Sequence, residues 1–301
     1  MPNQPLGPTG LLAQSMTLPA GSQSMAMGGM TMRAQGMDGR KRGARIFSIT
    51  PAVNGKTVWN LDADGPLNLS TQGTWTITPL SSFTVNVKAW GEGGQDPGRS
   101  GLPGAGAFAG GLVSFVGGEA LTLGVGQGRG TAGPFGASGG GWVGLLVSAS
   151  SAAILMAGAG GGEGNNSGVN GGPGGWPSGT TGNTDPAGND TGGGGATQSA
   201  VGAGGVAGGG ISPVNGTPGS GRTGGTGGWG GSGGGGGYFG GGGGAGSDFS
   251  GAGGGGGSSY FDPTRVTGAQ MLSGSGTTPG NALDPARNGA GSSLSGRLIL
   301  L

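Results

Sequence analysis

Glycine occupies 88 of the 301 positions of this chain, and this excess constrains the fold more than any other feature. An ordinary protein contains about 7 % glycine. Glycine loses more backbone freedom on folding than any other residue, so a chain this rich in it is costly to order. Two outcomes remain: a disordered chain, or an architecture in which only glycine fits. Collagen is excluded, because no strict Gly-X-Y period runs through the sequence.

Charge and missing residue types narrow the function. Charged residues make up only 8 % of the chain, and 13 basic residues nearly balance 12 acidic ones, which gives no reason to expect binding to nucleic acid or to a membrane surface. The chain has no cysteine and no histidine. This removes disulfides, thiolate metal sites and the commonest general base. We therefore expect no enzyme activity, no cofactor and no metal site. No apolar run reaches the roughly 18 residues that a membrane span needs.

Residues 1–45 are predicted to form an extended anchoring arm. The methionines there show neither a helical nor a strand period, and five of the basic residues cluster at its end. One interpretation is an arm that docks into other proteins, with flexible methionine side chains filling irregular grooves. A disordered tail and a nucleic-acid-binding arm remain alternatives. The residues concerned are Met16, Met25, Met27, Met30, Met32 and Met37, and Arg33, Arg40, Lys41, Arg42 and Arg45.

The first residues lack a basic segment followed by an apolar one, so no secretory signal is predicted. We expect a chain that stays inside a cell or leaves it as part of a particle.

Residues 46–157 are predicted to be all-β, an antiparallel sandwich or jelly roll. The clearest strand covers residues 83–90, with Phe83, Val85, Val87 and Ala89 on one face. Other short strands follow with turn signals about every ten residues. A closing strand within residues 291–301 is expected to return to the sandwich. The other expected strands cover residues 45–50, 56–61, 66–70, 73–78, 112–116, 121–125, 142–147 and 152–156.

Residues 158–290 are predicted to form a glycine lattice. About half of residues 158–257 are glycine, with five-residue runs at 233–237, 240–244 and 253–257. Such runs can adopt the extended polyglycine II helix, which has no internal hydrogen bonds. Several helices side by side satisfy each other's backbone groups, and packing this close allows no Cβ at interior positions such as Gly235 and Gly255. The alternative, a flexible linker, would favour Gly/Ser repeats without aromatic residues.

Five motifs follow one another along the chain: VKAWGEGG at 87–94, LTLGVG at 121–126, ILMAGAGGG at 154–162, GGGYFGGGG at 235–243 and GGGGGSSY at 253–260. This ordered series resembles the glycine-rich module of bacteriophage tail-fibre and receptor-binding proteins. A similar module occurs in the extracellular region of anaplastic lymphoma kinase-type receptors, which also carry disulfides, a membrane helix and a kinase that this chain lacks. The resemblance covers roughly residues 85–301. It implies a β-sandwich combined with polyglycine II helices and used for binding.

On this basis we expect a structural virion surface protein, either a tail-fibre tip or a fibre or spike on the capsid. Its partners would be other virion proteins, bound through residues 1–45, and a host surface glycan or protein. A homo-oligomer is expected, with a trimer suggested by analogy. Trp59, Trp75 and Trp90 are interpreted as core residues, with an interface stripe as the alternative. A secreted or cell-surface matrix or adhesion protein is the alternative function.

Binding residues are expected at the turns or rim of the lattice, because its interior accepts no side chains. Flat aromatic rings stack on sugars and amides hydrogen-bond to them. The best candidates are Trp176, Trp229, Tyr238 and Phe239, in the loops 176–190 and 228–249. For Tyr238 and Phe239 an equal alternative is that they plug the lattice against the sandwich.

Pairs of carboxylates could catalyse glycoside hydrolysis, and carboxylates in glycine-rich loops could bind calcium. The pairs Asp62 with Asp64, Glu92 with Asp96, and Asp185 with Asp190 are interpreted instead as turn residues beside glycine or proline. Asp185, Asp190 and Asp248 show no recognisable calcium-ligand spacing.

Overall fold

The computed structural model describes residues 24–27, 30–33, 44–98, 101–165, 168–247 and 250–301. The chain divides into two compact units, Met1–Arg42 and Gly43–Leu301. Most of the predicted arm, including Met16, Met37 and the basic residues 40–42, lies outside the described residues, as do Asp248 and Phe249.

The first unit contains two short antiparallel strands, β1 (Ser24–Met27) and β2 (Met30–Arg33). Their register pairs Met25 with Met32 and Met27 with Met30. Directly opposed residues of an antiparallel pair share a face, so the four methionines belong to one face of this two-stranded sheet. The expectation that the methionines follow no strand period is therefore wrong for these four. Met25 and Met27 lie two positions apart, as do Met30 and Met32, whereas the six methionines of residues 16–37 taken together do not keep this spacing.

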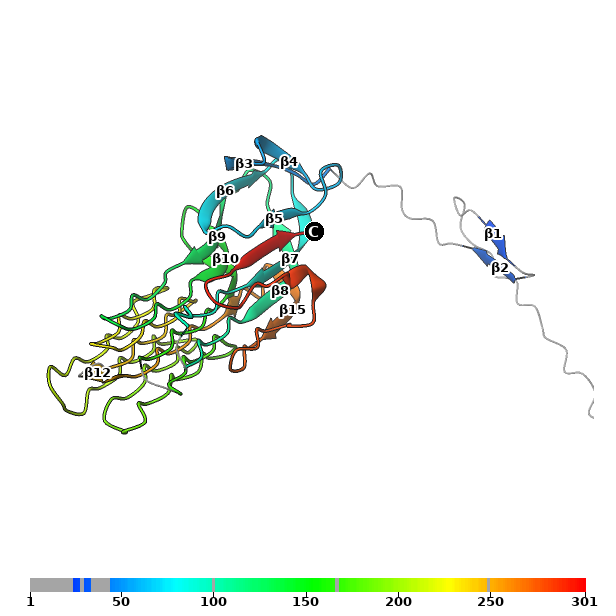
Figure 1. The fold of residues 1–301 in the computed structure, drawn as a ribbon. Coiled ribbons are helices and arrows are strands. Elements are labelled where there is room, and N and C mark those ends of the chain that lie inside the picture. Colours follow the sequence, from blue (N-terminus) through cyan, green and yellow to red (C-terminus); the bar gives the residue numbers. More distant parts are fainter. Residues whose placement is uncertain (1–23, 28–29, 34–43, 99–100, 166–167, 248–249) are drawn as a thin grey trace, which may run out of the picture. The chain divides into compact units, whose positions relative to one another are not determined.

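The second unit is all-β, as predicted, with two antiparallel sheets packed together and one short 3₁₀ helix, η1 (Pro285–Arg287), among its described residues (Figure 1). The strands are β3 (Ile46–Val53), β4 (Lys56–Asn60), β5 (Leu67–Leu69), β6 (Gly73–Pro79), β7 (Phe83–Trp90), β8 (Phe108–Phe115), β9 (Leu121–Gln127), β10 (Trp142–Val147), β11 (Ala153–Ala157), β12 (Gly246–Ser247), β13 (Ser250–Gly251), β14 (Tyr260–Phe261), β15 (Val266–Leu272) and β16 (Arg297–Leu300).

The larger sheet has seven strands in the order β14-β11-β10-β9-β6-β3-β4, and the smaller has five in the order β15-β8-β7-β16-β5. The C-terminal strand β16 lies between β7 and β5. Tight turns set part of this order: β3 and β4 form a hairpin through Asn54 and Gly55, whose φ angles are 50° and 76°. Asn-Gly is favoured there because both turn residues need positive φ.

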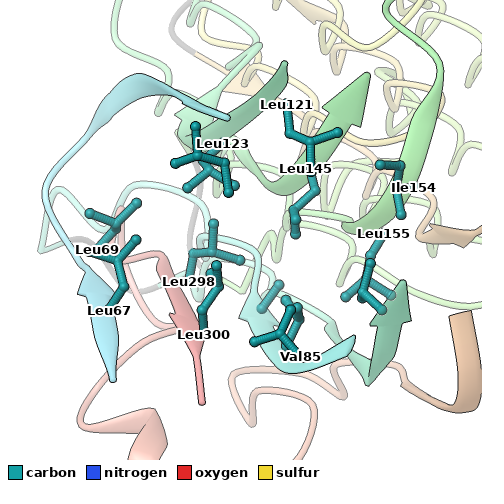
Figure 2. Packing of buried hydrophobic residues seen from close by; sticks show 14 of the residues in the cluster. Leu67, Leu69, Val85, Leu121, Leu123, Leu145, Ile154, Leu155, Leu298 and Leu300 are labelled. Carbon is teal, nitrogen blue, oxygen red and sulfur yellow. The ribbon is translucent and has the colours of Figure 1, made fainter. Parts of the chain in front are cut away.

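The core lies between the two sheets and consists mainly of aliphatic side chains (Figure 2), together with Phe47, Trp59 and Phe115. On β7 the inward residues Val85, Val87 and Ala89 are buried, which confirms the predicted faces of this strand. Trp59 and Trp90 are buried and Trp75 packs against the core. Trp90, however, lies in a separate cluster with Phe108 and Ile299.

The glycine-rich segments continue from the ends of the strands, and they include more of the chain than expected. We call the described parts of residues 91–107, 128–141 and 158–259 the glycine body. Its first two segments fall inside the range predicted as sandwich, yet Gly104 donates its N–H to Gly161 O and Gly130 to Gly234 O. Conversely, β14 and β15 fall inside the range predicted as lattice but belong to the two sheets.

Candidate functional site

The glycine body is held together by backbone hydrogen bonds between segments far apart in the sequence. The run 253–257 shows the pattern. Gly254 donates to Gly162 O at 3.1 Å, Gly255 to Gly242 O at 2.9 Å and Gly256 to Thr180 O at 2.8 Å. Three successive residues thus bond to three different neighbouring segments, which a flat sheet does not do. Each such segment is surrounded by others, and its N–H groups are satisfied without side chains.

This packing leaves no room for a Cβ atom. A methyl carbon added to Gly255 would lie less than 3.0 Å from the carbonyl oxygen of Gly194, and one added to Gly235 would lie equally close to the carbonyl oxygen of Ala159. Both glycines are buried. Backbone atoms cannot swing aside as a flexible side chain can, so the lateral hydrogen bonds require glycine at these positions.

A buried ion pair lies where the glycine body meets the sandwich. Glu92 lies two residues after the end of β7 and is 1 % exposed. Arg129 donates to its two carboxylate oxygens from Nε and Nη2 at 2.7 and 2.6 Å, and Gly141 N donates at 2.7 Å. The carbonyl oxygen of Glu92 accepts from Gly160 N. Glu92 therefore fixes the two other glycine segments, 128–141 and 158–259, near the end of β7, through the kind of bidentate pair that is strong when desolvated.

Three of the four candidate binding residues lie where the glycine body meets the sheets. The ring of Trp176 is 5.5 Å from that of Phe261 in β14. Tyr238 stacks on Tyr260 with ring centroids 4.0 Å apart, and both pack against the cluster of Trp142, Leu146, Ala153 and Met156 on the seven-stranded sheet. Phe239 contacts Tyr238 edge-on, at 5.0 Å. Burial raises the pKa of Tyr260, with smaller contributions from Tyr238 and Asp262.

Trp229 lies at the opposite end of the glycine body. Figure 1 shows this end, away from the sheets, at the label β12. A Cβ on Gly246 of β12 would collide with the carbonyl oxygen of Trp229, which places Trp229 beside β12. Its ring packs edge-on against Phe135 at 6.0 Å, and Gly230 N donates to Pro134 O. Trp229 is half-buried, whereas Phe135 is 49 % exposed.

We call this end of the glycine body, formed by the turns at 134–136, 185–190, 206–214, 229–231 and β12, the far end. Further apolar side chains are exposed there: Val206, Ile211 and Val214. Val214 is bridged to Gly246 and so lies close to Trp229. Phe135 was missed as a candidate. The signal in the sequence was Gly-Pro-Phe-Gly, an aromatic residue in a turn between glycines, the same context that singled out Tyr238.

The two buried aspartates of the far end hold turns together. Asp185 Oδ1 accepts from Asn189 N and Asp190 N, and its Oδ2 accepts from Ser250 Oγ. Asp190 accepts from Gly208 N and Ser247 Oγ. All four carboxylate oxygens thus already have hydrogen-bond donors. Across the described residues, no three acidic side chains gather in an arrangement that would hold a metal ion.

In the other two carboxylate pairs, each carboxylate bonds to a different partner. Asp62 bonds with Arg45, and Asp64 with Lys56. The hydrogen bond from Asn60 N, and after it the one from Lys56, lowers the pKa of Asp64. Glu92 is committed to Arg129, whereas Asp96 accepts from Gly98 N in an exposed turn.

A scan against protein-family models gives no match for this chain, and a search of curated proteins gives none either. In the part of the chain that the structure describes, helices of the length and hydropathy needed to cross a bilayer are absent.

Proposed function

We propose that the glycine body is a lattice of polyglycine II helices and that it serves as a rigid stalk for attachment. The supporting observation is the hydrogen-bond pattern of residues 254–256, each bonded to a different neighbour. A three-residue helix turns its N–H groups in three directions in this way. The interior of such a lattice has little room for side chains, so we assign recognition to its two ends.

The protein is then a structural, non-enzymatic surface protein of a virion, a tail-fibre tip or a fibre or spike on the capsid. The resemblance of its glycine motifs to phage receptor-binding modules supports this class. One end of the lattice is tied to the sandwich by Glu92 and by the rings of Trp176 and Tyr238. The far end is the free one, and we assign contact with the host glycan or protein to Trp229 and Phe135.

The arm, residues 1–45, anchors the protein to the particle. An isolated two-stranded hairpin is marginally stable in water, and β1 and β2 place four methionines on one face. We assign this face to a groove on another virion protein, where methionine adapts to irregular surfaces. Basic residues follow it, from Arg33 to Arg45, and favour an acidic rim on the partner. A trimer on the particle is part of the same proposal.

The test is protein identification on purified particles. The wild-type chain is expected on particles, and a deletion of residues 1–42, which spares the Arg45–Asp62 ion pair, is expected to be absent from them. Recovery of the wild-type chain in the cell envelope or medium instead would favour the secreted or cell-surface alternative. Normal incorporation of the deletion variant would show that the arm is not the anchor.

A sharper pair of variants tests the methionine face. Met25→Gln with Met32→Gln changes one opposed pair on that face, whereas Ala26→Gln with Thr31→Gln changes the neighbouring opposed pair on the other. The first is expected to lower incorporation at least tenfold, because two apolar side chains are lost from the contact. The second is expected to incorporate normally. Equal loss in both variants would argue against a methionine contact.

A further inference from the structure

A cleft of about 480 Å³ opens on the outer face of the five-stranded sheet, over β7, β8 and β15. The register of these strands explains it. Gly110 of β8 lies directly between Lys88 of β7 and Gln270 of β15. Gly110 adds no side chain to the middle of this row, where the ring of Phe108 lies close by, while the positions on both sides carry long polar side chains. Two strand spacings separate Lys88 from Gln270, about 10 Å.

A β-bulge shapes the same place. The pairing of β15 with β8 shifts between Thr267 and Gln270, and Gly268 in between has a φ of 62°. An extra residue in one strand bends it and re-aims the side chains that follow. Here the bulge leaves Ala269 and Met271 against the core while Thr267 and Gln270 line the cleft.

The rim of the cleft consists of polar groups without partners inside the protein. Within the described residues, the side chains of Asn86, Thr267 and Gln270 make no hydrogen bond. Two are amides, each of which donates and accepts, and the third is a hydroxyl. Leu112, 49 % exposed, supplies an apolar contact in the same cleft, and the buried Phe108 lies beneath it.

The one cation at the cleft is neutralised. Lys88 Nζ donates to Asp284 Oδ2 at 2.6 Å, and both side chains are largely buried, at 26 % and 10 % exposure. The lining residues carry no other charge. A ligand that matches this site is therefore uncharged, rich in groups that both donate and accept, and apolar on one side.

We propose that this cleft binds a neutral saccharide unit. The hydroxyls of a sugar ring pair with the amides of Asn86 and Gln270 and with Thr267, and its C–H face rests on Leu112. The site lies on the outer face of the sandwich and shares no residue with the far end. Its binding of a saccharide therefore does not depend on the proposed attachment function. It would give the protein a second, lateral contact with a polysaccharide.

The experiment is a titration of the ¹⁵N-labelled full-length chain with D-glucose, D-galactose, D-mannose and N-acetyl-D-glucosamine, followed by NMR. At least one sugar is expected to shift the side-chain amide signals of Asn86 and Gln270. Gln270→Ala is expected to weaken that binding about tenfold, the effect of losing one or two hydrogen bonds. Asn68→Ala, an exposed amide on β5 at the other edge of the same sheet, is the matched control and is expected to bind like wild type.

Three results would overturn the proposal: no shift with any of the four sugars, equal affinity of Gln270→Ala and wild type, or equal loss in Asn68→Ala. A further titration with D-glucuronate tests the neutral character of the site. Binding of glucuronate alone would mean that Lys88 is not neutralised and that the assigned ligand class is wrong. Gln270 is exposed on the edge strand, so its variant is expected to fold, and a thermal melt checks this.

Discussion

At the scale of single residues, the packing of the glycine body depends on the absence of a Cβ. Gly255→Ala is expected to destabilise the protein by about 1–3 kcal/mol or to prevent folding, because the methyl group collides with the carbonyl oxygen of Gly194. Chemical denaturation measures the change in the free energy of unfolding. Gly194→Ala is the control within the lattice, because its added carbon would lie 3.0 Å from the nearest atom, Ala203 N, a contact that a small shift relieves. Equal stability of Gly255→Ala and wild type would refute the close packing.

The buried ion pair gives a second prediction at this scale. Glu92→Gln keeps the size of the side chain but leaves Arg129 without its carboxylate, and is expected to cost about 3 kcal/mol of unfolding free energy. Asp62→Asn removes a charge from an exposed pair, in which Asp62 is 48 % exposed, and is expected to cost less than about 1 kcal/mol. If the two variants were equally stable, Glu92 would not fix the glycine body to β7.

At the scale of elements, the sequence predicted strands well where alternation was regular. Residues 83–90 and 142–147 were predicted with the bounds that β7 and β10 have. β15 was missed because the bulge at Gly268 breaks its alternation. β1 and β2 were missed although Met-Ala-Met and Met-Thr-Met flank a Gly-Gly pair, a hairpin signal that was readable.

The loop that carries η1 is fastened to β7 by Lys88 and Asp284, and this contact predicts a pH dependence. Burial acts to raise the pKa of Asp284, but hydrogen bonds from Lys88, Ala286 N and Asn281 outweigh it and hold the pKa below its ordinary value of 3.8. A carboxylate whose pKa is lower in the folded state stabilises the protein above the unfolded pKa. That stabilisation is lost as the pH falls through the folded pKa.

Thermal melts of wild type and Asp284→Asn between pH 7 and pH 2.5 test this. Wild type is expected to have the higher Tm above about pH 5, and the difference is expected to shrink below about pH 4 as Asp284 is protonated. Asp96→Asn, in an exposed turn, is the control. A Tm difference between the two proteins that stays constant through the acidic range would mean that the charge of Asp284 does not stabilise the fold.

At the scale of the whole molecule, the sequence could predict that glycine segments pack together but not which ones. Glycine has no side chain to distinguish one run from another, so nothing marked Gly254 as the partner of Gly162 or Gly255 as the partner of Gly242. For the same reason, the sequence could not place the candidate binding residues in the fold. Trp176 and Trp229 have similar glycine-rich surroundings in the sequence, yet one packs on β14 and the other lies beside β12. Only the path of the chain separates them.

Because Trp229 and Trp176 lie at opposite ends of the glycine body, their substitutions are expected to have opposite effects on attachment and stability. Trp229→Ala is expected to reduce attachment to the target more than tenfold, because aromatic anchors at a free end dominate binding. Its Tm is expected to change little, since the ring is half-buried and its ring contact is Phe135.

Trp176→Ala is expected to do the reverse: its ring supports Phe261 at the sheet edge, so stability falls by about 1–2 kcal/mol, a fraction of the cost of a fully buried tryptophan. Attachment of the folded fraction should remain. Particle adsorption to host cells, compared at a temperature where both variants are folded, measures the first effect, and thermal melts measure the second. Loss of attachment in Trp176→Ala alone would move the contact surface to the sandwich end. Loss in neither variant would exclude both tryptophans, and the exposed residues Phe135 and Ile211 would then have to carry attachment without them.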